Sequence, residues 1–155
     1  MRILEKKMRG SKGSITLIPQ NLDDLWHLYN IIAPGDLVSG KTTRRIRKEG
    51  ELGRASGGER RVVKITISVE NVSFHKFANM LRVGGRIVSG PKDIPLSSHH
   101  TLNIRVDDII TIYKEFWPSF MIKRVEKAEE SISTPNIIIV SIDCLLYTSD
   151  AADEL

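Results

Sequence analysis

Cysteine is almost absent from this sequence, and its scarcity excludes two classes of small protein. The 155 residues contain one cysteine, Cys144. A single thiol cannot build a disulfide framework, and it supplies too few thiolates for a zinc ribbon or knuckle. We therefore expect an ordinary hydrophobic core, which a chain of this length with 41% hydrophobic residues can build.

Long apolar runs are also missing. No stretch approaches the roughly 20 apolar residues that a membrane-spanning helix needs. Residues 1–10 carry several charges where a signal peptide would have an apolar segment. These two features predict a cytoplasmic protein.

Positive charge is unevenly distributed along the chain. The formal net charge is +4. Between Asp36 and Lys64 there are nine bases and four acids, a net charge of +5, and the rest of the chain carries 14 bases and 15 acids. A basic excess confined to one segment indicates a polyanionic partner, although a solvated charged face is the common alternative.

The first third of the chain predicts a hairpin followed by a helix. Residues 2–7 and 13–19 have the composition of short strands. Asn21 is a suitable helix cap, and the acidic pair after it suits the positive end of a helix. The apolar residues of this helix are expected on one face: Leu22, Leu25, Trp26, Tyr29 and Ile32.

Five further segments predict strands, at residues 37–46, 62–72, 80–88, 101–106 and 109–113. Gly84 and Gly85 predict a bulge or bend of the kind that lets a strand curl. The predicted fold class is α+β, mainly β: a small barrel with one short helix after the first hairpin and a C-terminal helix, although the sequence does not show whether the barrel closes. This last helix starts near Trp117-Pro118, ends near Glu130 and carries Phe120, Met121, Val125 and Ala128 at helical spacing.

The pattern divides the chain into four parts. Residues 1–130 are predicted to form one domain, 131–136 a polar linker, and 137–143 an orphan strand that begins a truncated second domain. Residues 144–155 (CLLYTSDAADEL) resemble translated sequencing-adaptor sequence and are expected to be a non-native tail. We therefore expect the chain to be incomplete.

Residues 35–42 fit the phosphate-binding pattern G-x-x-x-x-G-K-[ST]. The motif needs a buried strand before it and a helix after it. Here a helix and Pro34 come before it, and Thr42-Thr43-Arg44-Arg45 predicts a strand. The context therefore argues against nucleotide binding.

The histidines give no clear catalytic or metal site. His99 and His100 are adjacent, so on a strand they would face opposite sides. Ser39 and Ser56 have glycine neighbours but no strand-to-helix context for a nucleophile.

Arginines are the strongest functional signal. They flank residues 49–59, whose four glycines and one serine predict a flexible connection between two strand ends. Guanidinium groups bind phosphates bidentately, and no aromatic residue occurs between Asp36 and Thr66. We therefore expect recognition of RNA by shape and phosphate rather than by base stacking.

Several segments, taken together, resemble the N-terminal domain of the Pelota family in its archaeal form. They are MRILEK, LIPQNLDDLWHLYNIIAPGDLV, TTRRIRK, GERRV and SSHHTLNI. The resemblance covers residues 1–143. It implies an Sm-like β-barrel, followed by a central domain of which only residues 137–143 remain.

The resemblance also implies a function. Members probe the empty A site of stalled ribosomes with a basic loop, in no-go and nonstop mRNA surveillance, and promote subunit dissociation with a translational GTPase and a recycling ATPase. The implied partners of this monomeric domain are the decoding centre, rRNA and mRNA, with no cofactor. The implied RNA-contacting residues are Lys41, Arg44, Arg45, Arg47, Lys48, Arg54, Arg60 and Arg61, while Thr42 and Thr43 are expected only to shape the strand.

The family has also been credited with a divalent-metal-dependent endoribonuclease activity in this domain. That activity is the alternative hypothesis. It would need two or three convergent carboxylates, and the candidates in the basic segment are scattered: Asp36, Glu49, Glu51 and Glu59. The sequence therefore predicts no metal site and no catalytic residue.

Overall fold

The computed structural model describes residues 1–46, 59–92 and 94–130. The elements are β1 (Arg2–Arg9), β2 (Lys12–Ile18), α1 (Leu22–Ile31), β3 (Leu37–Ile46), β4 (Glu59–His75), the short 3-10 helix η1 (Lys76–Ala78), β5 (Met80–Ser89), β6 (His99–Ile104), β7 (Ile110–Lys114) and α2 (Ser119–Glu130). The predicted mainly-β α+β class is confirmed. The predicted linker, orphan strand and tail at residues 131–155 lie outside the described residues.

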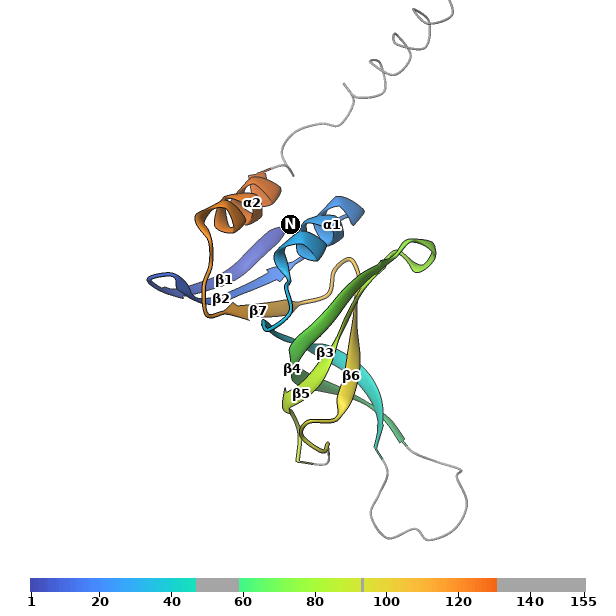
Figure 1. The fold of residues 1–155 in the computed structure, drawn as a ribbon. Helices are drawn as coiled ribbons and strands as arrows, with labels where there is room; N and C mark the ends of the chain where they lie inside the picture. The colour runs from blue at the N-terminus through green and yellow to red at the C-terminus, as the bar shows by residue number, and fades with distance from the viewer. Residues whose placement is uncertain (47–58, 93, 131–155) are drawn as a thin grey trace, which may run out of the picture.

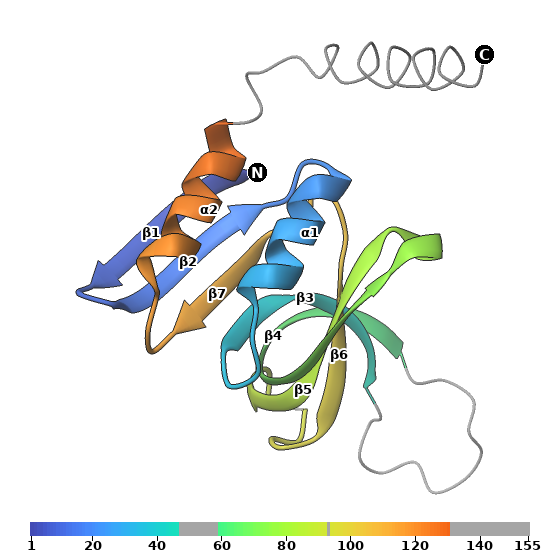
Figure 2. The same ribbon diagram turned by 45° about the horizontal axis from the view of Figure 1, so that its top comes forward.

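All the described strands belong to one antiparallel sheet, in the order β1-β2-β7-β3-β4-β5-β6 (Figure 1). Both α-helices lie on the same side of this sheet, near β1, β2 and β7 (Figure 2). The buried indole Nε1 of Trp117 donates to the Gly13 carbonyl at 2.8 Å, which anchors the start of α2 to β2. No helix in the described part of the chain is long and apolar enough to cross a membrane.

Helix α1 begins as its sequence predicts, but it buries a different face. The Asn21 side chain accepts a hydrogen bond from the Asp24 backbone N–H at 2.8 Å. The buried apolar residues of the helix are Leu25, Leu28 and Ile31. The predicted face is therefore wrong in part, because Leu22, Trp26 and Tyr29 are exposed. In α2, Val125 and Ala128 are buried as expected and Phe120 is exposed.

Strands β3 to β6 form the strongly curled half of the sheet (Figure 2). A bulge helps to produce the curl: Val69 pairs with Gly85 and Asn71 with Gly84, so Glu70 is the extra residue on β4. A Cβ atom on Gly85 would lie 1.9 Å from the Ser68 carbonyl oxygen, so the backbones approach too closely for a side chain. The bulge predicted at the glycine pair is confirmed.

The predicted barrel is not closed in the structure, which has an open seven-stranded sheet instead. Among the described residues no backbone ladder joins β6 to β3, so the sheet stays open. Strand β7 pairs with β3 along Leu37–Gly40 and occupies the edge at which a barrel would close. Nevertheless β6 curls round toward β3, where Gly40 packs against Leu102.

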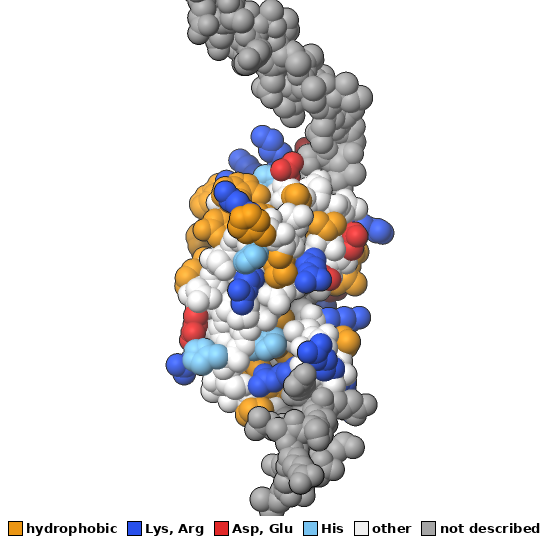
Figure 3. Space-filling view, turned by 90° about the vertical axis from the view of Figure 1, so that its right-hand side faces the viewer, with side chains coloured by type: hydrophobic (Ala, Val, Ile, Leu, Met, Phe, Trp, Pro, Cys, Tyr) orange, Lys and Arg blue, Asp and Glu red, His pale blue; other side chains and the backbone are white. Residues whose placement is uncertain are grey.

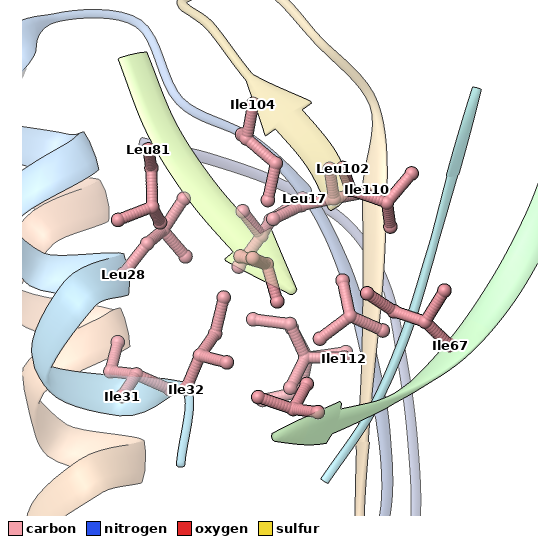
Figure 4. Close-up of a cluster of buried hydrophobic side chains, with 14 of the residues drawn as sticks. Leu17, Leu28, Ile31, Ile32, Ile67, Leu81, Leu102, Ile104, Ile110 and Ile112 are labelled. Carbon is pink, nitrogen blue, oxygen red and sulfur yellow. The ribbon is translucent and has the colours of Figure 1, made fainter. Parts of the chain in front are cut away.

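The core lies between the helices and one side of the sheet, which we call the inner face; the opposite side is the outer face. Alternation along the strands places every second side chain in this core. The close-up in Figure 4 shows α1 residues meeting strand residues from both halves of the sheet. The labelled residues are Leu17, Leu28, Ile31, Ile32, Ile67, Leu81, Leu102, Ile104, Ile110 and Ile112, all of them buried.

Candidate nucleic-acid interface

The β3–β4 hairpin aligns basic residues directly opposite one another. Its register pairs Lys41 with Lys64, Arg44 with Arg61 and Arg45 with Arg60. Directly opposed residues in an antiparallel pair place their side chains on the same face, about 5 Å apart at Cβ. The described side chains therefore form two cross-strand pairs of like charge, Lys41–Lys64 and Arg44–Arg61, each at an electrostatic cost to the fold.

These two pairs lie on opposite faces of the sheet. Val63 and Ile65 are buried and mark the inner face of β4. Arg61 precedes Val63 by two residues and therefore shares the inner face with its partner Arg44. The pair Lys41–Lys64 falls on the outer face by the same alternation.

On the outer face, Lys41 and Lys64 line a shallow groove of about 470 Å³. The Thr16 and Thr111 hydroxyls form a hydrogen bond of 2.9 Å within it. The groove is lined by three lysines, one glutamate, hydroxyl side chains and one isoleucine: Lys7, Lys41, Lys64, Glu5, Ser14, Thr16, Ser39, Thr111 and Ile109. Hydroxyls and ammonium groups of this kind suit phosphate and sugar oxygens.

On the inner face, the hairpin meets β6. The Thr42 hydroxyl and His100 Nε2 lie 3.0 Å apart in a hydrogen bond. Burial and, secondarily, the nearby Arg44 guanidinium lower the pKa of His100 below its ordinary value of 6.5. Arg44 itself is half-buried. The predicted opposite orientation of the two histidines is confirmed, because His99 instead faces Glu70, with Nδ1 3.4 Å from a carboxylate oxygen.

Carboxylates are scarce around these bases. In the described part of the chain, none of the hairpin bases Lys41, Arg44, Arg60, Arg61 and Lys64 forms an ion pair with an acid. The view in Figure 3 shows lysine, arginine and histidine side chains next to the lower of the two grey regions, where acidic side chains are few. The hairpin therefore presents positive charge that the described residues do not neutralise.

The structure describes only some of the predicted RNA-contacting residues. The β3–β4 hairpin brings Lys41, Arg44, Arg60 and Arg61 together, and the backbone of Arg45 also lies on it. The other predicted contact residues, Arg47, Lys48 and Arg54, lie outside the described residues. Thr42, expected only to shape the strand, also makes the hydrogen bond to His100.

Three residues on the two faces of the sheet were not among the predicted RNA-contacting residues. Lys64 could have been found from strand alternation, because it pairs with Lys41 once the hairpin register is known. Lys7 enters the outer groove through the β1–β2 hairpin. His100 has no sequence signal for its position, which depends on the curl that brings β6 toward β3.

The two alternative chemistries gain no support from the geometry. Lys41 lies within strand β3, and no helix follows it, so the phosphate-binding motif lacks its structural context. Asp36 is engaged by the buried Lys114 ammonium and by the Ala33 N–H at 2.8 Å. Glu49 and Glu51 lie outside the described residues, and Glu59 is described only in its backbone. Among the described residues, no group of three His, Cys, Asp or Glu side chains could hold a metal ion.

Comparison with known sequences identifies the family. The model of the Pelota N-terminal domain matches residues 1–129. A pelota homologue from Natronomonas pharaonis is 44% identical over 144 residues, which cover 92% of this chain and 40% of that protein. A homologue from Methanocaldococcus jannaschii is 41% identical over 143 residues, with the same two coverages. The chain thus spans less than half the length of these relatives.

Comparison with solved structures agrees. Archaeoglobus fulgidus Pelota has a TM-score of 0.66 and 38% identity over 87% of this chain and 35% of its own. An archaeal Pelota described as ribosome-bound with ABCE1 has a TM-score of 0.68 and 40% identity, covering 83% and 36%. Saccharomyces cerevisiae Dom34, at 23% identity and a TM-score of 0.64, shares the fold. The family match over most of its length shows that this chain belongs to the Pelota N-terminal domain family.

Proposed function

We propose that this chain is the RNA-binding domain of a ribosome rescue factor and that its β3–β4 hairpin probes the empty A site of stalled ribosomes. The observation that supports it is the presence of two like-charged cross-strand pairs on that hairpin, Lys41–Lys64 and Arg44–Arg61. Opposed bases destabilise an isolated hairpin, whereas a polyanion bound across them would turn the repulsion into attraction.

The family relationship supports the ribosome as the source of this polyanion. One similar archaeal structure is described as ribosome-bound Pelota with ABCE1. Rescue also requires dissociation of the subunits, which we assign to the longer protein acting with a recycling ATPase and a translational GTPase. The strong curl of β3 to β6 and the packing of Gly40 against Leu102 support a relation to Sm-like domains.

The proposal predicts RNA contacts at Lys41, Arg44, Arg45, Arg47, Lys48, Arg54, Arg60 and Arg61. Binding to ribosomes over a range of salt concentrations tests it. A variant with Arg44, Arg45, Arg60 and Arg61 changed to Ala should bind far more weakly. Its plot of log affinity against log salt should also be shallower, by roughly 0.7–0.9 for each phosphate that the variant no longer binds.

A matched variant controls for net charge. Arg9, Arg82, Lys123 and Lys127 are exposed bases away from the β3–β4 hairpin, and changing them to Ala removes the same number of charges. This control should keep most of the affinity and the full salt slope. Equal losses of affinity in the two variants, or unchanged affinity in the hairpin variant, would reject the hairpin as the RNA-binding element.

A further inference from the structure

The inner end of the hairpin holds a cluster of polar side chains from three strands. Thr42 and Arg44 come from β3, Arg61 from β4 and His100 from β6. The register places Arg61 directly opposite Arg44 on the inner face. The Thr42–His100 hydrogen bond of 3.0 Å joins β3 to β6 where no backbone ladder does so among the described residues.

One donor of this cluster is unsatisfied. Arg44 Nη1 is buried and has no hydrogen-bond partner among the described residues. Leaving a charged N–H without an acceptor costs more than leaving a neutral one, so such groups in proteins are normally paired. The guanidinium fork is built to receive two oxygens of a carboxylate or phosphate. The unpaired Nη1 donor therefore has the chemistry of an anion site.

The charged groups around His100 are the Arg44 guanidinium, Arg61 beside it, and the Glu70 carboxylate, which lines a pocket together with His100. From β3, His100 meets Thr42 and the Arg44 guanidinium, and from β5 its register partner is Gly85, which has no side chain. From β4, Arg61 stands beside Arg44 on the same face. The nearest acid on β4, Glu70, is occupied by Arg86 at 3.0 Å and by His99 on the outer face. Glu70 lines a pocket with His100, but its carboxylate is already paired with Arg86 and His99, and no described carboxylate forms an ion pair with Arg44 or Arg61.

We infer that Arg44, Arg61 and His100 form a phosphodiester-binding site on the inner face, separate from the outer groove of Lys41 and Lys64. The inference rests on the proposed function and adds to it a defined contact. A phosphate of RNA accepts from the guanidinium groups of Arg44 and Arg61, while the hydrogen bond to Thr42 holds the imidazole of His100 beside them. RNA then contacts the hairpin on both faces.

Binding of the phosphate is coupled to protonation of His100. In the free protein, burial and Arg44 keep the pKa of His100 low, so the imidazole is neutral at neutral pH. A phosphate anion stabilises the imidazolium and raises the pKa of His100. Affinity therefore increases as the pH falls toward the free-protein pKa, and each pKa unit between bound and free states gives a tenfold change in affinity.

NMR titration of His100 in the full chain tests the site, with an RNA stem-loop as probe and inorganic phosphate as a second arm. His100→Gln assigns the signal. At saturating RNA the pKa of His100 should rise, and this rise should disappear in Arg44→Gln. In Lys64→Gln, an outer-face variant, RNA should bind more weakly yet still produce the same rise at saturation.

The outcomes separate the two proposals. RNA that binds in a salt-dependent way while the pKa of His100 stays unchanged would overturn the phosphodiester site and leave the hairpin function standing. Absence of RNA binding altogether would overturn both. A rise with phosphate alone supports the site and identifies the phosphate group, rather than the sugar or base, as its ligand. A rise that persists in Arg44→Gln would remove Arg44 from the site.

Discussion

The two ends of the sheet treat their positive charges differently. At the helix-covered end, bases meet acids: the Met1 ammonium lies 2.6 Å from Asp24, Lys6 lies 3.2 Å from Glu126, and Lys12 lies 2.9 Å from Glu115. At the hairpin end, bases face bases across β3 and β4. Both ends belong to one continuous sheet, so the difference is not a property of the fold type.

This contrast separates charges that serve the structure from charges that serve binding. A buried charge is tolerated when a partner and hydrogen bonds satisfy it, as for Met1 and Asp24, which are both almost fully buried. An exposed like-charged pair gives the folded chain nothing and lowers its stability slightly. Changing the first kind should therefore affect stability, and changing the second kind should affect RNA binding.

The largest effect is expected at Asp24. Asp24→Ala leaves the buried Met1 ammonium without its counter-ion and removes the acceptor of the Gln20 N–H, bonded at 2.8 Å. Removing one partner of a buried pair costs about 3–5 kcal/mol. Urea unfolding followed by circular dichroism should show this loss of stability.

The neighbouring acid provides a matched control. Asp23 is exposed in the same helical turn, and Asp23→Ala should cost only about 0.3–1 kcal/mol through the helix dipole. Folded Asp24→Ala protein should bind RNA like the wild type. Similar losses of stability in both variants would show that the buried pair contributes nothing beyond the interaction of a carboxylate with the helix dipole.

Lys64→Glu is expected to have a smaller effect, which raises the stability of the protein and weakens its binding to RNA. In Lys64→Glu the repulsion with Lys41 becomes an attraction, which should stabilise the protein by about 0.2–1 kcal/mol. The same change places a carboxylate in the outer groove and should weaken RNA binding. Urea unfolding and a salt-dependent RNA binding assay measure the two effects.

Lys12→Glu is the counterpart at the other end of the sheet. It replaces the ion pair with Glu115 by two like charges and removes the ammonium that lies 5.8 Å from the Tyr113 ring centroid. Stability should fall and RNA binding should stay close to that of the wild type. If both variants changed stability in the same direction, the proposed difference between the two ends would be wrong.

Local sequence patterns predicted the elements of this fold well. Caps, turns and alternation depend on neighbouring residues, so the cap at Asn21 and the bulge at Gly84-Gly85 could be found before the structure. The buried face of α1 could not. An amphipathic helix shows that some face is apolar, but its placement on the sheet decides that Leu28 is buried and Trp26 is exposed.

The candidate site could be predicted from the sequence to the same extent as the fold. Clustered arginines on either side of a glycine-rich segment marked the hairpin, because charge density is visible in the sequence. The division of Arg44 and Lys41 between two faces requires the register, and the approach of His100 to Thr42 requires the curl of the whole sheet. Whether the predicted barrel closes could not be read from the sequence for the same reason, since the pairing of β7 with β3, which leaves the sheet open, depends on long-range contacts.

The smallest expected effect concerns the exposed Lys12–Glu115 pair. Hydrogen bonding to Tyr113 and Glu115 raises the pKa of Lys12 to about 12, and the bond to Lys12 lowers the pKa of Glu115. The lysine's contribution to stability is complete below its ordinary pKa of 10.5 and is lost as the pH rises through about 12. The glutamate's contribution is complete above its ordinary pKa of 4.5 and is lost as the pH falls through its lowered value.

Glu115→Gln should therefore bring the pKa of Lys12 back toward 10.5, whereas Asp23→Asn should leave it at about 12. NMR titration of the Lys12 side chain measures both. Because the pair is fully exposed, water and salt screen it, and the unfolding midpoint should hardly move. A large loss of stability in Glu115→Gln would mean that ion pairs stabilise the fold even at the surface. The unpaired bases of the hairpin would then destabilise the fold more than their exposure suggests.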